Sequence, residues 1–134
     1  MIHLDTSFLV DLLREAGRDE TGPATRFLDK ALGEALGISV HVACELHVGA
    51  ELSSNPAQER RRVERLIASI ETEYPDHRFA GTYARLLAWQ QRSRQRIATM
   101  DLLIATAAVV AGAPLVTRNV KDFARVPGLD LLAY

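Results

Sequence analysis

Cysteine, lysine and long hydrophobic runs are all scarce in this sequence of 134 residues. The single cysteine, Cys44, excludes an intramolecular disulfide and favours a cytoplasmic protein, and its apolar neighbours predict a small core residue. The longest uncharged run, residues 102–116, is too short to cross a bilayer and is broken by Gly112 and Pro114. Asp5 interrupts the first apolar run, so we expect neither a signal peptide nor a contact with membranes.

Charge gives no overall bias toward a partner, because the formal net charge is −1. The basic residues are 14 arginines and only 2 lysines, and nine of the arginines lie between Pro56 and Ile97 beside five acids. The rest of the chain carries seven basic and twelve acidic residues. An acidic body with an arginine-rich flank suits a cation together with a phosphate ligand. The alternative interpretation is a set of solvated helix faces with intrahelical ion pairs.

The hydrophobic pattern predicts an α/β fold. With 48% apolar residues the chain is long enough for one core, so we expect a single domain over residues 1–134. Short apolar runs predict strands at 2–5, 35–40, 114–118 and 129–134. Helical spacing predicts helices at 7–17, 23–33, 41–53, 57–73, 81–95 and 99–112, and residues 119–128 are expected to form a loop. Strands that alternate with helices indicate a parallel sheet covered by helices on both faces.

Three acids lie where acids are uncommon. Asp5 ends the first apolar strand, Glu45 lies in the middle of a weakly polar helix, and Asp101 opens the most apolar helix. Carboxylates are rarely buried without a partner. Asp5 and Asp101 have a structural alternative as helix caps, and Asp101 would also gain from the helix dipole. Glu45 has the weakest structural explanation of the three.

A fourth polar position follows the strand predicted at 114–118. Asn119 and Asp122 lie just beyond this strand, although a turn asparagine and an aspartate in a polar loop are simpler explanations of each. Ligands of parallel sheets bind beyond the carboxyl ends of the strands, where these residues would meet the three acids. Crowded carboxylates repel one another unless a cation intervenes. Oxygen ligands without cysteine or paired histidine select Mg²⁺, with Mn²⁺ as a substitute, and phosphodiester hydrolysis is the natural chemistry of such a site.

Three segments in this order resemble the PIN-domain ribonucleases, above all the VapC-type toxins of bacterial and archaeal toxin–antitoxin pairs: LDTSFLVDLL, ACELHVGAEL and DLLIATAAVVAGAPLVTRNVKDFARVPGL. The resemblance runs from end to end of the chain. It implies an α/β/α sandwich with a short, mostly parallel sheet. It also implies a Mg²⁺-dependent endoribonuclease that cuts tRNA, rRNA or mRNA and so inhibits translation. Its expected partners are a second copy in a homodimer and a VapB-like antitoxin that wraps the surface and inserts a segment near the acids.

The same resemblance assigns catalytic roles to the acids. It makes Asp5 and Asp101 direct Mg²⁺ ligands and places Glu45 close to the ion or behind a water molecule. The fourth position, an acid in many members, is Asn119 here. This exchange lowers the charge of the site and leaves the number of ions open, and Asp122 is a possible substitute.

Further residues are expected beside the substrate. The resemblance implies that Thr6 supplies the hydroxyl after the first acid and that Thr117 or Asn119 orients water or substrate. Arg118 adjoins the site and is a candidate for a phosphate contact, with a surface ion pair as the alternative. Members often have threonine at the position of Val42, and its loss removes a possible helix cap.

Other functional classes stay open at this point. A PIN-like scaffold that acts only by binding a partner would explain Asn119. A DNA-directed nuclease would use the same acids, because nothing local reads the 2′-hydroxyl of RNA. A phosphate-accepting signalling module usually pairs adjacent acids after its first strand, where this chain has only Asp5.

Overall fold

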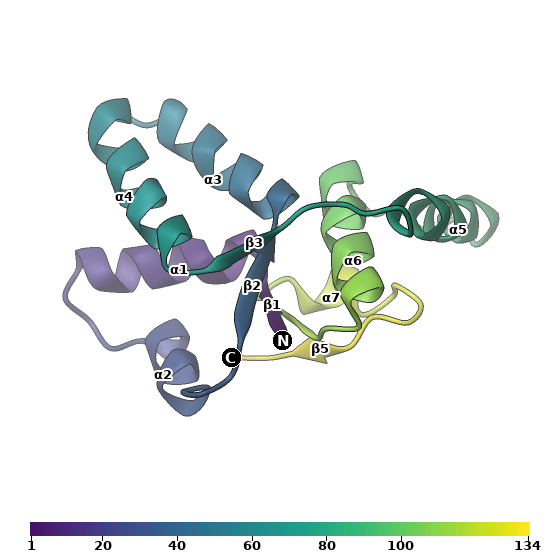
Figure 1. The fold of residues 1–134 in the computed structure, drawn as a ribbon, viewed down its shortest axis with the longest axis horizontal. Coiled ribbons are helices and arrows are strands. Elements are labelled where there is room, and N and C mark those ends of the chain that lie inside the picture. The colour runs from purple at the N-terminus through teal and green to yellow at the C-terminus, as the bar shows by residue number, and fades with distance from the viewer.

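The computed structural model of the chain describes all 134 residues. Its centre is a five-stranded sheet in the order β3-β2-β1-β4-β5, in which every neighbouring pair is parallel (Figure 1). The strands are β1 (Ile2–Leu4), β2 (Leu36–Ser39), β3 (Glu71–Glu73), β4 (Leu115–Val116) and β5 (Leu131–Leu132). The expected parallel sheet of an α/β fold is therefore confirmed, and the first strand of the chain lies in its middle.

Helices cover both faces of this sheet. They are α1 (Thr6–Gly17), α2 (Pro23–Lys30), α3 (Val40–Glu51), α4 (Pro56–Ala68), α5 (Phe79–Arg92), α6 (Thr99–Ala111) and α7 (Val120–Phe123). Figure 1 shows α1 to α4 on one side of the sheet and α5 to α7 on the other. Helix α3 starts directly after β2 and contacts both α1 and α6, so it joins the two layers beyond the carboxyl ends of the strands.

Helix α6 is apolar on nearly every side because it packs against α3, α5 and the sheet. Leu102 and Ile104 are both 1% exposed, and burial of such side chains contributes roughly 1.5–3 kcal/mol each. The helix ends at Gly112, whose φ of 63° lies in the left-handed region that glycine tolerates best. None of the helices is both long enough and apolar enough to span a membrane.

Two elements differ from the prediction. The helix expected at 57–73 ends at Ala68, and residues 71–73 form the edge strand β3, which pairs with β2. The prediction failed because the polar Glu-Thr-Glu sequence continues the helical pattern. Its strand conformation depends on pairing with β2, which is distant in sequence. Within the loop expected at 119–128, residues 120–123 form the short helix α7, which buries Phe123.

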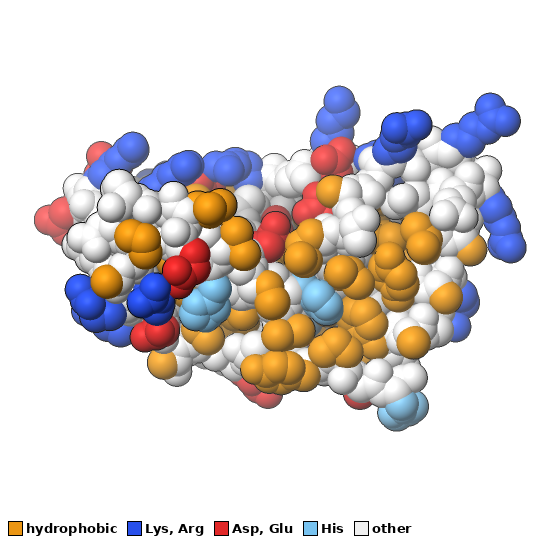
Figure 2. All heavy atoms as spheres, turned by 90° about the horizontal axis from the view of Figure 1, so that it is seen from above, with side chains coloured by type: hydrophobic (Ala, Val, Ile, Leu, Met, Phe, Trp, Pro, Cys, Tyr) orange, Lys and Arg blue, Asp and Glu red, His pale blue; other side chains and the backbone are white.

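The prediction that Cys44 is a core residue is wrong, because its side chain is exposed. Helix α3 turns Val42 and Leu46 toward the core and leaves Cys44 on its outer surface. Val48 and Leu52 are likewise 56% and 81% exposed. Figure 2 shows hydrophobic side chains spread over a broad area of one face of the molecule.

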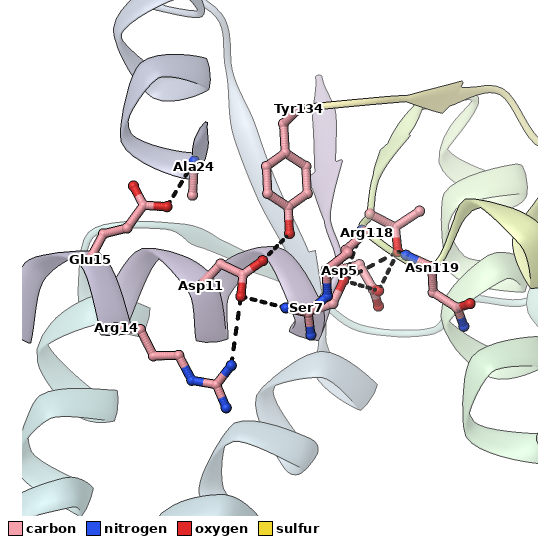
Figure 3. Close-up of polar contacts among 10 residues, drawn as sticks. Asp5, Ser7, Asp11, Arg14, Glu15, Ala24, Arg118, Asn119 and Tyr134 are labelled. Atoms are coloured by element: carbon pink, nitrogen blue, oxygen red, sulfur yellow. Dashed lines mark hydrogen bonds and ion pairs between the residues drawn. The ribbon is translucent and has the colours of Figure 1, made fainter. Parts of the chain in front are cut away.

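Glu15 is a buried acid that the sequence pattern did not single out. Its carboxylate accepts hydrogen bonds from the backbone N–H groups of Gly22, Ala24 and Thr25, at 2.9–3.0 Å, and from the Thr25 hydroxyl at 2.7 Å. Figure 3 shows the bond between Glu15 and Ala24. Burial alone would raise the pKa of Glu15, but these hydrogen bonds outweigh it and lower the pKa below its ordinary value. The carboxylate thus binds the free N–H groups at the start of α2 and joins that helix to α1.

Candidate active site

Polar side chains gather beyond the carboxyl ends of the central strands. Asp5 follows β1, and Thr117 follows β4. Helix α3 leads away from β2 and carries Glu45 in its second turn, and Asp101 lies in the first turn of α6. Parallel pairing of β1 with both β2 and β4 brings these distant segments to one place.

Two hydroxyl groups hold the carboxylate of Asp5. Thr117 Oγ1 donates to Asp5 Oδ2 at 2.7 Å and Ser7 Oγ donates to the same oxygen at 2.9 Å. Asp5 occupies the N-cap position of α1, but its side chain makes no capping hydrogen bond. Asp5 is only 4% exposed and its second oxygen, Oδ1, has no hydrogen-bond partner, so one carboxylate oxygen is oriented and free to bind a ligand.

The same hydroxyl groups fix the backbone after β4. Ser7 Oγ accepts the N–H of Arg118 at 3.1 Å, and Thr117 Oγ1 accepts the N–H of Asn119 at 3.0 Å. Figure 3 shows Asp5, Ser7, Arg118 and Asn119 close together at this point. Thr117 is 1% exposed, so in this structure it orients Asp5 and does not reach a substrate. Sequence reasoning missed Ser7, whose only signal was a hydroxyl two residues after the first acid.

Glu45 is oriented by a third hydroxyl group. Thr6 Oγ1 donates to Glu45 Oε1 at 2.7 Å and so links the start of α1 to α3, while Glu45 Oε2 has no partner. Thr6, expected beside the substrate, therefore positions an acid here. Valine at position 42, where members of the family often have threonine, does not leave α3 without a cap. Ser39 supplies the cap, because its Oγ accepts a hydrogen bond from the Val42 N–H at 3.3 Å.

Asp101 carries the clearest electrostatic signature of the site. Its pKa is raised from 3.8 to about 6, first because burial disfavours the charged carboxylate and then because the charges of Asp5, Glu45 and Asp122 act on it. The carboxylate caps none of the free N–H groups of α6 and pairs with no basic side chain. The capping role that was the structural alternative for Asp101 is thus not realised.

The fourth position is a pair of residues held by an arginine. Asn119 Nδ2 donates to Asp122 Oδ2 at 3.2 Å, and Arg125 Nη2 donates to Asp122 Oδ1 at 3.1 Å. Both oxygens of Asp122 are therefore hydrogen-bonded, in contrast to the free oxygens of Asp5 and Glu45. The charge of Asp122 still reaches Asp101, so Asp122 adds to the negative potential of the site.

Arg118 makes the ion pair that was the alternative to a phosphate contact. Its Nη1 lies 2.7 Å from Asp11 Oδ1. Tyr134 Oη donates to the other oxygen of Asp11 at 2.6 Å (Figure 3). The Tyr134 ring also packs edge-on against the Phe8 ring, with 4.8 Å between the ring centroids. The Arg118 side chain is 58% exposed, so an incoming phosphate would compete with Asp11 for its guanidinium.

The chemistry of these residues fits a hard divalent cation. The donors are carboxylate oxygens, with no histidine or cysteine among the groups that act on Asp101. No three acid, histidine or cysteine side chains are already arranged as a metal-binding cluster. The free oxygens of Asp5, Glu45 and Asp101 share a negative potential that a cation would neutralise.

Residues 2–129 match the protein family described as the PIN domain. A relative named Ribonuclease VapC1, from Rickettsia felis, is 34% identical over 135 residues, which cover 96% of this chain and 92% of the relative. Ribonuclease VapC1 from Haemophilus influenzae is 28% identical, with 95% and 92% of the two chains covered.

Solved structures show the same fold. A chain in the crystal structure of VapBC2 from Rickettsia felis, bound to a DNA fragment from their promoter, superposes with a TM-score of 0.88, 26% identity and coverage of 100% and 99%. A chain in the structure of VapBC-1 from nontypeable Haemophilus influenzae gives a TM-score of 0.81 at 28% identity, with coverage of 99% and 98%.

Proposed function

The chain belongs to the PIN-domain family and, within it, to the VapC ribonucleases, and from this premise we propose that it is a Mg²⁺-dependent endoribonuclease that inhibits translation. The observation that carries the proposal is the grouping of acids beyond the strand ends, where Asp5 and Glu45 each keep an unpartnered carboxylate oxygen. Burial, together with the charges of Asp5, Glu45 and Asp122, raises the pKa of Asp101 to about 6. Strongly perturbed carboxylates in a cluster are typical of catalytic sites. The names of the relatives support RNA as the substrate.

Asp5, Asp101 and Glu45 would hold the ion, each through an oxygen that has no other partner. A bound divalent cation supplies a more acidic water molecule and charge stabilisation at a phosphate oxygen. Ser7 and Thr117 orient Asp5, and Thr6 orients Glu45. Because these hydroxyl groups already hold the acids in place, binding a ligand costs less side-chain entropy. Mn²⁺ is expected to replace Mg²⁺ because both prefer oxygen ligands.

The proposal is tested by incubating the purified chain with end-labelled tRNA, rRNA and single-stranded DNA, with Mg²⁺, with Mn²⁺ and with EDTA. We expect internal cuts in RNA with either ion and none with EDTA. The variants Asp5→Asn and Asp101→Asn should lose cleavage while circular dichroism shows a native fold. Full activity in EDTA would refute the metal mechanism, and cleavage of DNA alone would make the chain a DNA-directed nuclease.

A VapB-like antitoxin is the proposed protein partner. Two of the similar solved structures are described as VapBC assemblies, which supports this choice. Helices α1, α3 and α4 border a groove of about 370 Å³ that has Val10, Leu46 and Val63 in its lining and includes Glu45. An antitoxin segment in this groove would reach the acids and block access to them.

Co-expression with the product of the adjacent upstream gene tests this partner. We expect a complex that copurifies and does not cleave RNA. Gly49→Arg places a charge at an exposed position of the groove, where an added side chain meets no neighbouring atom, and should prevent the complex. Leu32→Arg, at an exposed position outside the groove, should not. A complex that forms equally well with Gly49→Arg would contradict docking in this groove.

A homodimer is the proposed assembly. Val48, Leu52 and Tyr74 are exposed by 56%, 81% and 72%, and Figure 2 shows a broad hydrophobic face of the kind that a second copy covers. Light scattering should give twice the monomer mass of 14.8 kDa. Leu52→Glu should shift the mass toward the monomer, and a monomer at all concentrations of the unmodified chain would exclude the homodimer.

A further inference from the structure

The arginines of the basic flank differ in whether they have acidic partners. On α4, Arg60 pairs with Glu51 at 2.8 Å and Arg62 pairs with Glu59 at 3.1 Å. Residues 77–100, by contrast, contain five arginines and no aspartate or glutamate. Arg78, at the start of this segment, pairs with Asp76 at 2.8 Å. Ion pairs therefore explain part of the flank but not the arginines that directly precede Asp101.

Three of these arginines lie close together at the end of α5 and in the connector from α5 to α6 (residues 93–98). Arg92, Arg94 and Arg96 are all exposed, and none of them forms an ion pair. Arg92 is favoured by the dipole at the C-terminus of α5, but this effect does not extend to the other two. The three side chains present an uncompensated positive patch to solvent.

Arg94 occupies a position that normally selects glycine. Its φ is 54°, in the left-handed region. The Arg94 N–H bonds Gln91 O at 3.4 Å and the Gln95 N–H bonds Gln90 O at 3.0 Å, which is the hydrogen-bond pattern of a Schellman cap. Glycine would adopt this backbone at lower cost, so the arginine at this position is not explained by the fold.

Arg125 joins the connector to the acidic site. Its Nη1 donates to Gln95 Oε1 at 2.7 Å, and its Nη2 donates both to Arg96 O at 2.9 Å and to Asp122 Oδ1 at 3.1 Å. One guanidinium thus links the backbone of the positive patch to an acid whose charge acts on Asp101. Figure 2 shows basic side chains along the rim of the face beside acidic ones near its middle.

We propose that Arg92, Arg94 and Arg96 form a track that binds the phosphodiester backbone of the RNA substrate beside the acidic site. The inference rests on the proposed ribonuclease function. The clustered acids repel a polyanion, so a strand can approach them only if positive charge close by offsets the repulsion. Exposed arginines without acidic partners provide this charge and contact phosphates without reading sequence.

The test measures binding of the full-length protein to a labelled single-stranded RNA of mixed sequence, in EDTA so that the RNA stays intact. The track variant is Arg92→Gln/Arg94→Gln/Arg96→Gln. The control is Arg61→Gln/Arg65→Gln/Arg85→Gln, which removes the same charge from other arginines without acidic partners. The slope of log K against the logarithm of the salt concentration should become shallower by about 2 in the track variant. Each phosphate contact to a single strand contributes about 0.7 to this slope, and three contacts are lost. Between 50 and 200 mM salt the unmodified chain should then lose about 16-fold more affinity than the track variant.

Arg94→Gly separates binding from folding. Glycine suits the left-handed backbone, so the melting temperature should stay the same or rise while RNA affinity falls. Replacement of all three arginines by lysine should retain most of the affinity, because lysine keeps the charge. An equal loss of RNA affinity in the control triple variant would overturn the track. A track variant that still binds RNA but no longer binds polyglutamate would also overturn it, because that result would indicate an acidic protein partner. If RNA binds through the track but is not cut with Mg²⁺, the ribonuclease function fails and the track stands.

Discussion

The hydroxyl of Thr117 donates a 2.7 Å hydrogen bond to Asp5, a residue 112 positions earlier in the chain. This bond joins the ends of the neighbouring strands β1 and β4 at the acidic site. It also leaves the second oxygen of Asp5 as the one that can bind a ligand. The orientation of the most buried acid therefore depends on a hydroxyl group from the far end of the sequence.

Thr117→Ala should weaken both the site and the fold. Loss of a donor to a buried carboxylate costs about 1–3 kcal/mol in the free energy of unfolding, measured by urea denaturation. RNA cleavage should fall about 10- to 100-fold, as expected when a group that orients a metal ligand is removed. Thr117→Ser keeps the hydroxyl and should restore most of the activity. Equal activity of the alanine variant and the unmodified chain would show that Asp5 needs no such support.

Asp101→Asn should stabilise the metal-free protein while it abolishes cleavage. The pKa of Asp101 rises from 3.8 to about 6 on folding, so above pH 6 the folded state carries an unfavourable charge, and this cost disappears as the pH falls from about 6 to about 4. Because the side chain is half-exposed, we expect a gain of only about 1 kcal/mol at neutral pH. Thermal melts in EDTA should show the gain in full at pH 7.5 and only in part at pH 5. A variant that is less stable at pH 7.5 would contradict the electrostatic account.

The cleavage rate at limiting Mg²⁺ should increase with pH around the pKa of Asp101, about 6. The ionised carboxylate is the form that binds a cation, so protons and metal compete for it. Saturating Mg²⁺ should therefore shift the midpoint of the pH profile to a lower pH. A midpoint that does not depend on the Mg²⁺ concentration would assign the titration to another group.

Asp122→Asn should reduce cleavage less than Asp101→Asn. Asp122 already accepts hydrogen bonds from Asn119 and Arg125 on its two oxygens, whereas Asp101 has no such partner. The comparison uses rates at saturating Mg²⁺ for the two variants. A larger effect at Asp122 would identify it as a direct ligand.

Glu15→Gln should destabilise the protein without changing the chemistry of the site. The pKa of Glu15 is lowered by its hydrogen bonds, so its contribution to stability is fully present above the unfolded value of 4.5 and is lost as the pH falls below it. The difference in unfolding free energy between the unmodified chain and the variant should thus be large at pH 7 and shrink below about pH 4. Glu20→Gln, at an exposed position, is the control and should change little. A constant difference at all pH values would exclude the charge of Glu15 as its cause.

The α/β fold could be predicted from the sequence because it depends on local pattern, and the charges of Asp5 and Glu45 act on Asp101 as their expected positions implied. The sequence shows directly which acids follow apolar strands or lie in an apolar helix, and parallel pairing of the strands brings such positions to one edge of the sheet. The hydroxyl groups of Ser7 and Thr117 could not be paired in advance, since serine and threonine occur at many positions and their bond depends on the register of β1 with β4.

The misjudged positions have a related cause. Glu15 resembles any acid on a polar helix face until the turn before α2 brings three N–H groups to it. Cys44 is apolar in type, but the orientation of α3 relative to α1 and α6 decides which of its faces is covered. Strand β3 exists because β2 offers an unpaired edge, a property of the assembled sheet and not of residues 71–73.

The position of β1 in the middle of the sheet has a consequence for biosynthesis. The ribosome makes this strand before the other four, but its neighbour β4 and the outer strand β5 lie more than 110 residues later in the chain. Until those residues emerge, a nascent polypeptide has no Thr117 to hold Asp5 and no finished pocket around the acids. A partly made chain of this fold would thus have its first acids in place long before the strand and the hydroxyl group that organise them.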